Sequence, residues 1–159
     1  NYETLMAEPR LPGAEPRVEK RGGSVKKLVI PAEVSELARL NEAINEELMG
    51  RGCSKRMQFQ VSLAAEEIFT NIASYAYGPV EGNAEVLIDV SGDPPELSIS
   101  FADRGAPFNP LVCPEADTSL GADEREIGGL GILLVKKTMD KVEYEYKDGK
   151  NILTITKRL

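Results

Sequence analysis

Two polar side chains stand four residues apart in a segment with helical periodicity, which reads VSLAAEEIFTNIASYAY from Val61 to Tyr77. They are Glu67 and Asn71, and residues at this spacing share a helix face at about 6 Å. A carboxylate there can orient or deprotonate a nucleophile, and a carboxamide oxygen can ligate a hard cation such as magnesium. Most such pairs are ordinary solvated helix surface, so this pair gains meaning only in combination with other segments.

A second group of candidate residues follows a predicted strand, in the segment DRGAPFNP at 103–110. An aspartate such as Asp103, placed where a strand leaves its sheet, can accept a hydrogen bond from an exocyclic amine such as that of adenine. Gly105 permits a close backbone approach or a left-handed turn, and Phe108 can wall a flat apolar pocket. The alternative is an ordinary turn in which the aspartate caps the loop.

A third segment places glycines directly before a predicted helix. It consists of Gly128, Gly129, Leu130, Gly131 and Ile132. Glycines in this position let backbone N–H groups and the positive end of a helix face a phosphate. The alternative is a flexible hinge between loop and helix. The segment is not the dinucleotide-binding fingerprint, because the full six-residue glycine spacing is absent.

Together the three segments resemble the GHKL superfamily of ATP-binding domains, and most of all its branch of anti-sigma-factor serine/threonine kinases. The combined pattern is E-x-x-x-N on a helix, D-x-G-x-x-F-x-P after a strand and G-G-L-G-I before a helix. The resemblance covers about residues 26–159. The phrase GGLGILLVKKTMD and the short final hairpin favour the anti-sigma branch over the larger relatives.

The resemblance implies roles for individual residues. Asn71 matches the residue whose side-chain oxygen ligates magnesium, and Glu67 matches the carboxylate that orients or activates the nucleophile. Asp103 matches the adenine-binding aspartate, with Gly105 as its companion. Related helices often carry a histidine four positions after the asparagine, where this chain has Tyr75. This departure bears on the efficiency of phosphoryl transfer and leaves ATP binding intact.

Further roles follow from the same resemblance. The glycine segment at 128–132 matches the phosphate cradle, and Phe108 belongs to the nucleotide pocket. The region from Asn109 to Ile127 matches a mobile lid over ATP, in which Arg125 is a candidate phosphate contact. Thr154 or Thr156 of the last predicted strand is expected at the adenine end.

The composition excludes several classes of protein. The chain has 159 residues, 42% of them apolar and 28% charged, which predicts one domain with a real core. It has no apolar run of about 18 residues, so no membrane span is expected. The net charge of −7 argues against direct nucleic-acid binding. Without histidine, Ser/His or Cys/His nucleophilic catalysis and the usual zinc sites are excluded. The two cysteines match no metal spacing and indicate reduced thiols of a cytoplasmic protein.

The order of predicted elements indicates the fold. The predicted strands are 26–31, 84–91, 96–102, 141–147 and 151–157, and the predicted helices are 35–50, 57–77 and 131–139. This order predicts an α+β fold, a two-layer sandwich with helices on one face of a mixed, mainly antiparallel sheet. The Bergerat fold of the GHKL domains has the same description. Prolines and glycines in 1–25 predict a linker or flexible tail, which leaves 26–159 as the ATPase domain.

The motifs and the resemblance together predict a regulatory kinase that uses ATP and magnesium. It is expected to phosphorylate a serine or threonine of a STAS-domain anti-sigma-factor antagonist, to bind a sigma factor or another output protein, and to form a homodimer. One alternative is a binding module whose nucleotide only sets its conformation, such as the C-terminal domain of a phosphatase or sensor protein. Another is an ATP hydrolase without a protein substrate.

Overall fold

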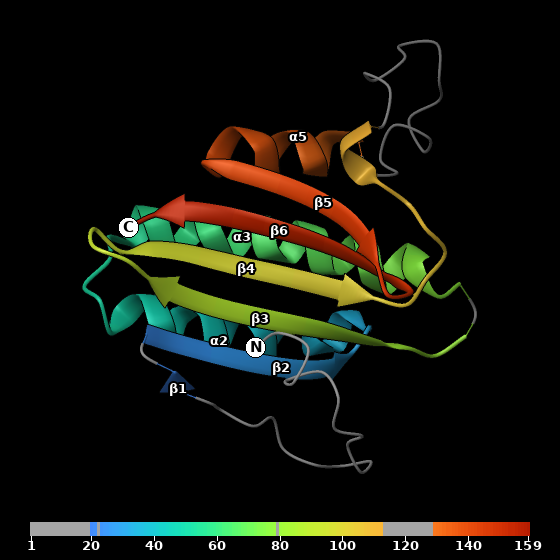
Figure 1. Cartoon of the computed structure of the whole chain (residues 1–159), viewed down its shortest axis with the longest axis horizontal. Coiled ribbons are helices and arrows are strands. Elements are labelled where there is room, and N and C mark those ends of the chain that lie inside the picture. The colour runs from blue at the N-terminus through green and yellow to red at the C-terminus, as the bar shows by residue number, and fades with distance from the viewer. Residues whose placement is uncertain (1–19, 22, 79, 113–128) are drawn as a thin grey trace.

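One antiparallel sheet organises the chain. The computed structural model describes residues 20–21, 23–78, 80–112 and 129–159, and Figure 1 shows how its elements are arranged. The described strands lie in the order β1-β2-β3-β4-β6-β5, and every pairing between them is antiparallel. The strands are β1 Lys20–Arg21, β2 Gly23–Pro31, β3 Asn83–Ser91, β4 Glu96–Asp103, β5 Lys141–Lys147 and β6 Lys150–Arg158.

Among the described residues, three α-helices form the second layer, with α3 in contact with both α2 and α5. In Figure 1, α2 and α3 lie behind the sheet, and α5 lies beside β5. The helical elements are α2 Leu37–Met49, α3 Lys55–Asn71, α5 Gly129–Thr138 and the short η1 Val34–Glu36, η2 Ile72–Ala76 and η3 Pro110–Val112. The predicted α+β sandwich is confirmed. None of the described helices combines the length and apolar character needed to cross a bilayer.

Strand alternation decides which side chains face the helices. In β4, Leu97, Ile99 and Phe101 are buried beneath the helices, and the same alternation continues to Asp103 at the strand's end. In β6, the buried Leu153 has the same parity as Asn151 at the strand's start. Two polar side chains therefore lie on the core side of the sheet, where a strand would ordinarily carry apolar residues.

Ser54 is the N-cap residue of helix α3. The Ser54 hydroxyl accepts a hydrogen bond from the Met57 backbone N–H at 3.2 Å, which satisfies one of the free donors of the first turn. The helix therefore starts at Lys55, slightly before the predicted 57. Apolar side chains at helical spacing then form the buried stripe, which includes Val61, Ala65 and Ile68. This stripe holds α3 over the centre of the sheet.

The sheet begins before the predicted strand 26–31. Lys20–Arg21 forms β1 and pairs with the start of β2 at Gly23–Ser24, although 1–25 was expected to be a linker or tail. Backbone pairing needs no apolar periodicity, so the sequence pattern gave no sign of it. Residues 1–19, which carry the rest of the predicted linker, lie outside the described residues.

A salt bridge attaches α2 to the sheet. Lys26 lies on the helix side of β2, and its Nζ pairs with the Glu46 carboxylate of α2. The Lys26 side chain is 10% exposed, whereas that of Glu46 is 60% exposed. The lysine therefore bears most of the desolvation, and the glutamate reaches it from solvent.

We expect Glu46→Gln to lower the free energy of unfolding by about 1 kcal/mol, because it leaves a buried ammonium with a weaker partner. Lys26→Met removes the buried charge itself and should cost less or be neutral. Urea unfolding of both variants tests this, with Glu42→Gln, an exposed glutamate of the same helix, as the control. A larger loss for Lys26→Met than for Glu46→Gln would contradict it.

Candidate functional site

A cavity of about 400 Å³ lies between the end of α3, the end of β4 and the start of α5. Its walls are mainly apolar, and its size falls in the range of small-molecule pockets. The lining residues come from α3 and η2, β4 and the loop after it, α5, β5 and β6, and they are Ile68, Asn71, Ile72, Tyr75, Ala76, Phe101, Asp103, Ala106, Pro107, Phe108, Pro110, Ile132, Tyr144, Asn151 and Leu153.

Asp103 is the carboxylate of this cavity. The residue is 8% exposed. Its Oδ1 accepts two hydrogen bonds, from the Gly105 backbone N–H at 2.9 Å and from Asn151 Nδ2 at 3.0 Å. Within the described part of the chain, Oδ2 accepts none. The carboxylate is thus fixed by one oxygen and keeps the other as an acceptor for a ligand.

Asn151 is a residue of the cavity that the sequence analysis did not identify. It lies opposite Asp103 in the β4–β6 pairing and is 7% exposed. Its Nδ2 also donates to the Ala106 carbonyl oxygen at 3.0 Å, and its Oδ1 accepts from the Phe108 backbone N–H at 2.9 Å and from the Tyr144 hydroxyl. The sequence feature that could have identified it is the alternation of β6, which places Asn151 on the same core-facing side of the strand as the buried Leu153.

A π-helical turn brings α3 to the cavity. Regular α-helix ends at Asn71, and residues Ile72–Ala76 form the π turn η2. A π turn has a wider hydrogen-bond spacing than an α-helix and occurs often at functional sites. Here Asn71 lines the cavity together with Tyr75 and Ala76. The asparagine predicted to bind magnesium is therefore half-buried on the cavity wall.

The loop after β4 approaches the end of this turn closely. An added Cβ at Gly105 would overlap the carbonyl group of Ala76. A residue without a side chain is therefore required at this position, for the close approach that the sequence analysis considered. The contact joins the segment that holds Asp103 to the segment that follows Asn71.

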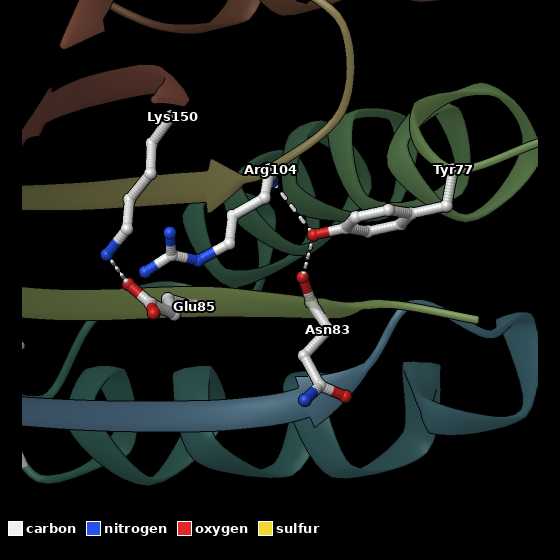
Figure 2. A network of polar contacts seen from close by, with 5 residues as sticks. All are labelled: Tyr77, Asn83, Glu85, Arg104 and Lys150. Atoms are coloured by element: carbon white, nitrogen blue, oxygen red, sulfur yellow. Dashed lines mark hydrogen bonds and ion pairs between the residues drawn. The ribbon is translucent and has the colours of Figure 1, made fainter. Parts of the chain in front are cut away.

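Tyr77 makes a second connection between these segments. Its hydroxyl accepts a hydrogen bond from the Arg104 backbone N–H at 2.8 Å and donates one to the Asn83 carbonyl oxygen at 2.6 Å (Figure 2). Beside this network, Lys150 of β6 pairs with Glu85 of β3 at 2.9 Å. Burial raises the pKa of the Tyr77 phenol above its ordinary 10.0, and the Arg104 N–H partly opposes this effect.

Glu67 lies beside the start of α5. It is not among the residues that line the cavity. Its carboxylate packs against Gly131, where any added Cβ would overlap Glu67 Oε2. Gly131 is the third residue of α5, and the positive end of a helix favours a negative charge there. Glu67 and Asn71 thus share one side of α3, but only Asn71 reaches the cavity.

The remaining predicted residues fall into three groups. Ile132 lines the cavity, and Gly129 and Leu130 open α5. Thr154 is not a lining residue, because β6 alternation places it on the other side of the strand from Leu153, where its hydroxyl bonds Ser100 at 3.1 Å. Gly128, Arg125 and most of the expected lid at 109–127 lie outside the described residues.

The described residues contain no cluster of three or more His, Cys, Asp or Glu side chains that could hold a metal ion. Magnesium usually takes few protein ligands and completes its coordination with phosphate oxygens and water. The Asn71 carboxamide on the cavity wall fits such a site, in which the nucleotide would bring the other ligands.

Comparison with known proteins identifies the class. Residues 30–157 match the model of the family described as histidine kinase-like ATPase domain. The chain belongs to this family, and the GHKL membership expected from the motifs is confirmed.

One relative is similar to this chain in amino-acid sequence. Serine/threonine-protein kinase BtrW of Bordetella bronchiseptica is 31% identical over 103 residues, which cover 65% of this chain and 72% of that protein. This match agrees with the kinase branch expected from the sequence.

Two solved structures share the fold. The crystal structure of the RsbU and RsbW domains of Rv1364c from Mycobacterium tuberculosis superposes with a TM-score of 0.59 at 17% identity, over 85% of this chain and 32% of that one. The SiaB-SiaC complex from Pseudomonas aeruginosa gives 0.54 at 18% identity, over 84% and 89%. This chain thus spans about a third of the mycobacterial chain.

We expect Tyr77→Phe to lower the free energy of unfolding by about 1 kcal/mol at neutral pH, because two partly solvated hydrogen bonds are lost. The raised pKa means that the folded chain binds the phenolic proton more tightly than the unfolded chain does. This contribution is complete below about pH 10 and is lost as the pH rises through the folded-state pKa.

The parent should therefore lose stability more steeply than Tyr77→Phe above about pH 10. Urea unfolding from neutral pH to about pH 11 measures both curves. Tyr146→Phe, at an exposed tyrosine, is the control for the effect of removing a phenol from the sheet. If the curves of Tyr77→Phe and the parent run parallel, the Tyr77 phenol does not cause the loss of stability at high pH.

Proposed function

We propose that the chain is an ATP-dependent serine/threonine kinase of the anti-sigma-factor type, acting in the cytoplasm. It would phosphorylate a STAS-domain antagonist, bind a sigma factor or another output protein, and work as a homodimer. The observation that carries the proposal is the buried Asp103, whose Oδ1 is occupied by two donors while Oδ2 stays available at an apolar cavity. The name of the 31% identical relative, a serine/threonine-protein kinase, supports the reaction class.

The cavity suits a purine base that carries an amine. Apolar side chains such as Ile68, Ile72 and Leu153 can cover the faces of a flat ring, and Phe108 adds an aromatic wall. A carboxylate oxygen can only accept, so Asp103 Oδ2 favours a ring substituent that donates. An adenine amine meets this requirement.

The phosphates would extend toward Asn71 and the first turn of α5. The backbone N–H groups at the start of a helix and its positive end favour negative charge. Bound magnesium would neutralise phosphate charge, with the Asn71 oxygen as one ligand. In phosphoryl transfer of this kind, most of the catalysis comes from positioning the reactants and from stabilising the charge that develops on the phosphates.

Glu67 would orient the acceptor hydroxyl. In the transfer step, the hydroxyl oxygen of the substrate bonds to the γ-phosphorus, and the bond from this phosphorus to the bridging oxygen of ADP breaks. ADP leaves with the electron pair, and the hydroxyl proton passes to the Glu67 carboxylate. Glu67 stands one helical turn before Asn71, beside Gly131.

The second candidate is a nucleotide-controlled binding module without phosphoryl transfer. The observation in its favour is that the Glu67 carboxylate packs against Gly131 and does not line the cavity. Kinase and module share the nucleotide site, so they differ only in whether Glu67 acts on a substrate.

Asp103→Asn tests the nucleotide site. The donors from Gly105 and Asn151 should hold the new carboxamide oxygen at the Oδ1 position, which leaves the NH₂ group to face the base. Loss of a charge-assisted hydrogen bond costs about 1.5–3 kcal/mol, so ATP affinity should fall about tenfold or more.

The same variant should bind ITP better relative to ATP than the parent does, because ITP presents an acceptor where ATP has the amine. Calorimetry with both nucleotides measures the change. Asp89→Asn, a half-buried aspartate of β3, is the matched control and should leave both affinities unchanged. An unchanged ATP affinity in Asp103→Asn would remove Asp103 from the site.

Glu67→Gln separates the kinase from the module. If Glu67 handles the hydroxyl proton, the variant should bind ATP normally and transfer phosphate about 10²–10⁴-fold more slowly. Single-turnover phosphorylation of the antagonist at saturating ATP is the measurement. Glu66→Gln, at the adjacent glutamate whose Oε1 accepts a hydrogen bond from Asn41 Nδ2 at 2.7 Å, is the matched control.

Four results are distinguishable in this assay. Label on the antagonist in the parent and its loss in Glu67→Gln support the kinase. Equal transfer rates in parent and variant exclude Glu67 as the catalytic residue. If the parent binds ATP but neither transfers phosphate nor releases it, the module is supported instead. Release of free phosphate without label on the antagonist indicates a hydrolase.

A further inference from the structure

The Asn151 side chain is hydrogen-bonded to its full capacity at the cavity. A primary amide has two N–H donors and two acceptor lone pairs. One N–H of Nδ2 donates to Asp103 Oδ1 at 3.0 Å, and the other is shared between the carbonyl oxygens of Ala106 at 3.0 Å and Gly105 at 3.3 Å. Oδ1 accepts from the Phe108 N–H and the Tyr144 hydroxyl. One buried side chain therefore joins β4, the loop after it, and β5.

The neighbours determine which way the amide points. The Phe108 backbone N–H can only donate, so it requires the amide oxygen. The carboxylate of Asp103 and the carbonyl of Ala106 can only accept, so they require the amide nitrogen. A reversed amide would face like groups on both sides. Asn151 thus has one orientation in which its partners are satisfied.

This orientation fixes Asp103. Its Oδ1 lies between the Asn151 N–H and the Gly105 N–H, and both of these groups are donors. The carboxylate cannot rotate without losing two hydrogen bonds in a buried place, which is costly. Oδ2 is therefore held in one position. The Phe108 and Ala106 contacts of Asn151 hold the adjoining cavity wall in the same way.

We propose that Asn151 is a positioning residue for base selection. It holds Asp103 Oδ2 in one position, where this oxygen can accept a hydrogen bond from the amine of a bound base. This inference rests on the proposed nucleotide site. Asn151 does not supply the contact to the base. It removes the orientational freedom that the Asp103 carboxylate would otherwise lose on binding, and this preorganisation makes the amine contact strong.

The test compares two ligands that differ only in the amine, ATP and purine riboside triphosphate, which has hydrogen at the same ring position. The readout is the ratio of their dissociation constants for the parent, Asn151→Ala and Asn151→Asp. The parent should prefer ATP about tenfold or more, as expected for a hydrogen bond to a charged group. In both variants the ratio should fall to about threefold or less.

Asn151→Asp guards against a simple folding defect. It keeps the size of the side chain and the Oδ1 acceptor for the Phe108 N–H, but replaces the donor to Asp103 with an acceptor. Its unfolding midpoint is measured in parallel. Asn45→Ala is the matched control: this half-buried asparagine lies on α2, where its Oδ1 accepts from Ser62 at 3.5 Å, and its ratio should equal that of the parent.

The outcomes separate the two proposals. If the parent binds neither ligand, the proposed nucleotide site fails. If the parent prefers ATP and the folded variants lose affinity for both ligands equally, with the ratio unchanged, Asn151 only supports the wall and the inference is overturned. A ratio that falls in both variants and stays unchanged in Asn45→Ala establishes the positioning role.

Discussion

Antiparallel pairing of β4 with β6 is the constraint on which the cavity depends. It brings the end of one strand beside the start of the other, so Asp103 and Asn151 face each other on the core side of the sheet. A shift of β6 by one residue would turn Asn151 to the opposite face of the sheet, away from Asp103. The same pairing buries Phe101 and Leu153, which hold the register through the hydrophobic core.

The helix layer is tied to this pair by contacts that need small groups or a well-placed hydroxyl. Gly105 meets the backbone of Ala76, and the Tyr77 hydroxyl bridges Arg104 and Asn83. These contacts fix the end of α3 relative to the end of β4. The two halves of the cavity, one with Asn71 and the other with Asp103, are therefore held at a set separation and act as one site.

Much of this arrangement follows from local sequence pattern. Alternation in ELSISFAD puts Asp103 on the core side, and helical periodicity puts Asn71 near the apolar stripe of α3. Asn151 was overlooked because its role depends on pairing between strands that are far apart in sequence, and parity alone does not name a partner. The π turn after Asn71 and the packing of Glu67 against Gly131 likewise arise from contacts between elements. Thr154, in contrast, was predicted to lie at the nucleotide site, although alternation in β6 already places it on the side of the strand that faces away from the cavity.

The position of Asn151 has a consequence for how the site comes into being during folding. Its partner Tyr144 is 7 residues away, within the β5–β6 hairpin, whereas Asp103 is 48 residues away. The short loop can close at small entropic cost, and the long one only when the central strands have joined. Only the Tyr144 contact of Asn151 is local to the hairpin, and its other contacts form in the long-range step that completes the sheet. A ligand that binds only the completed cavity would therefore raise the free energy of global unfolding of the chain.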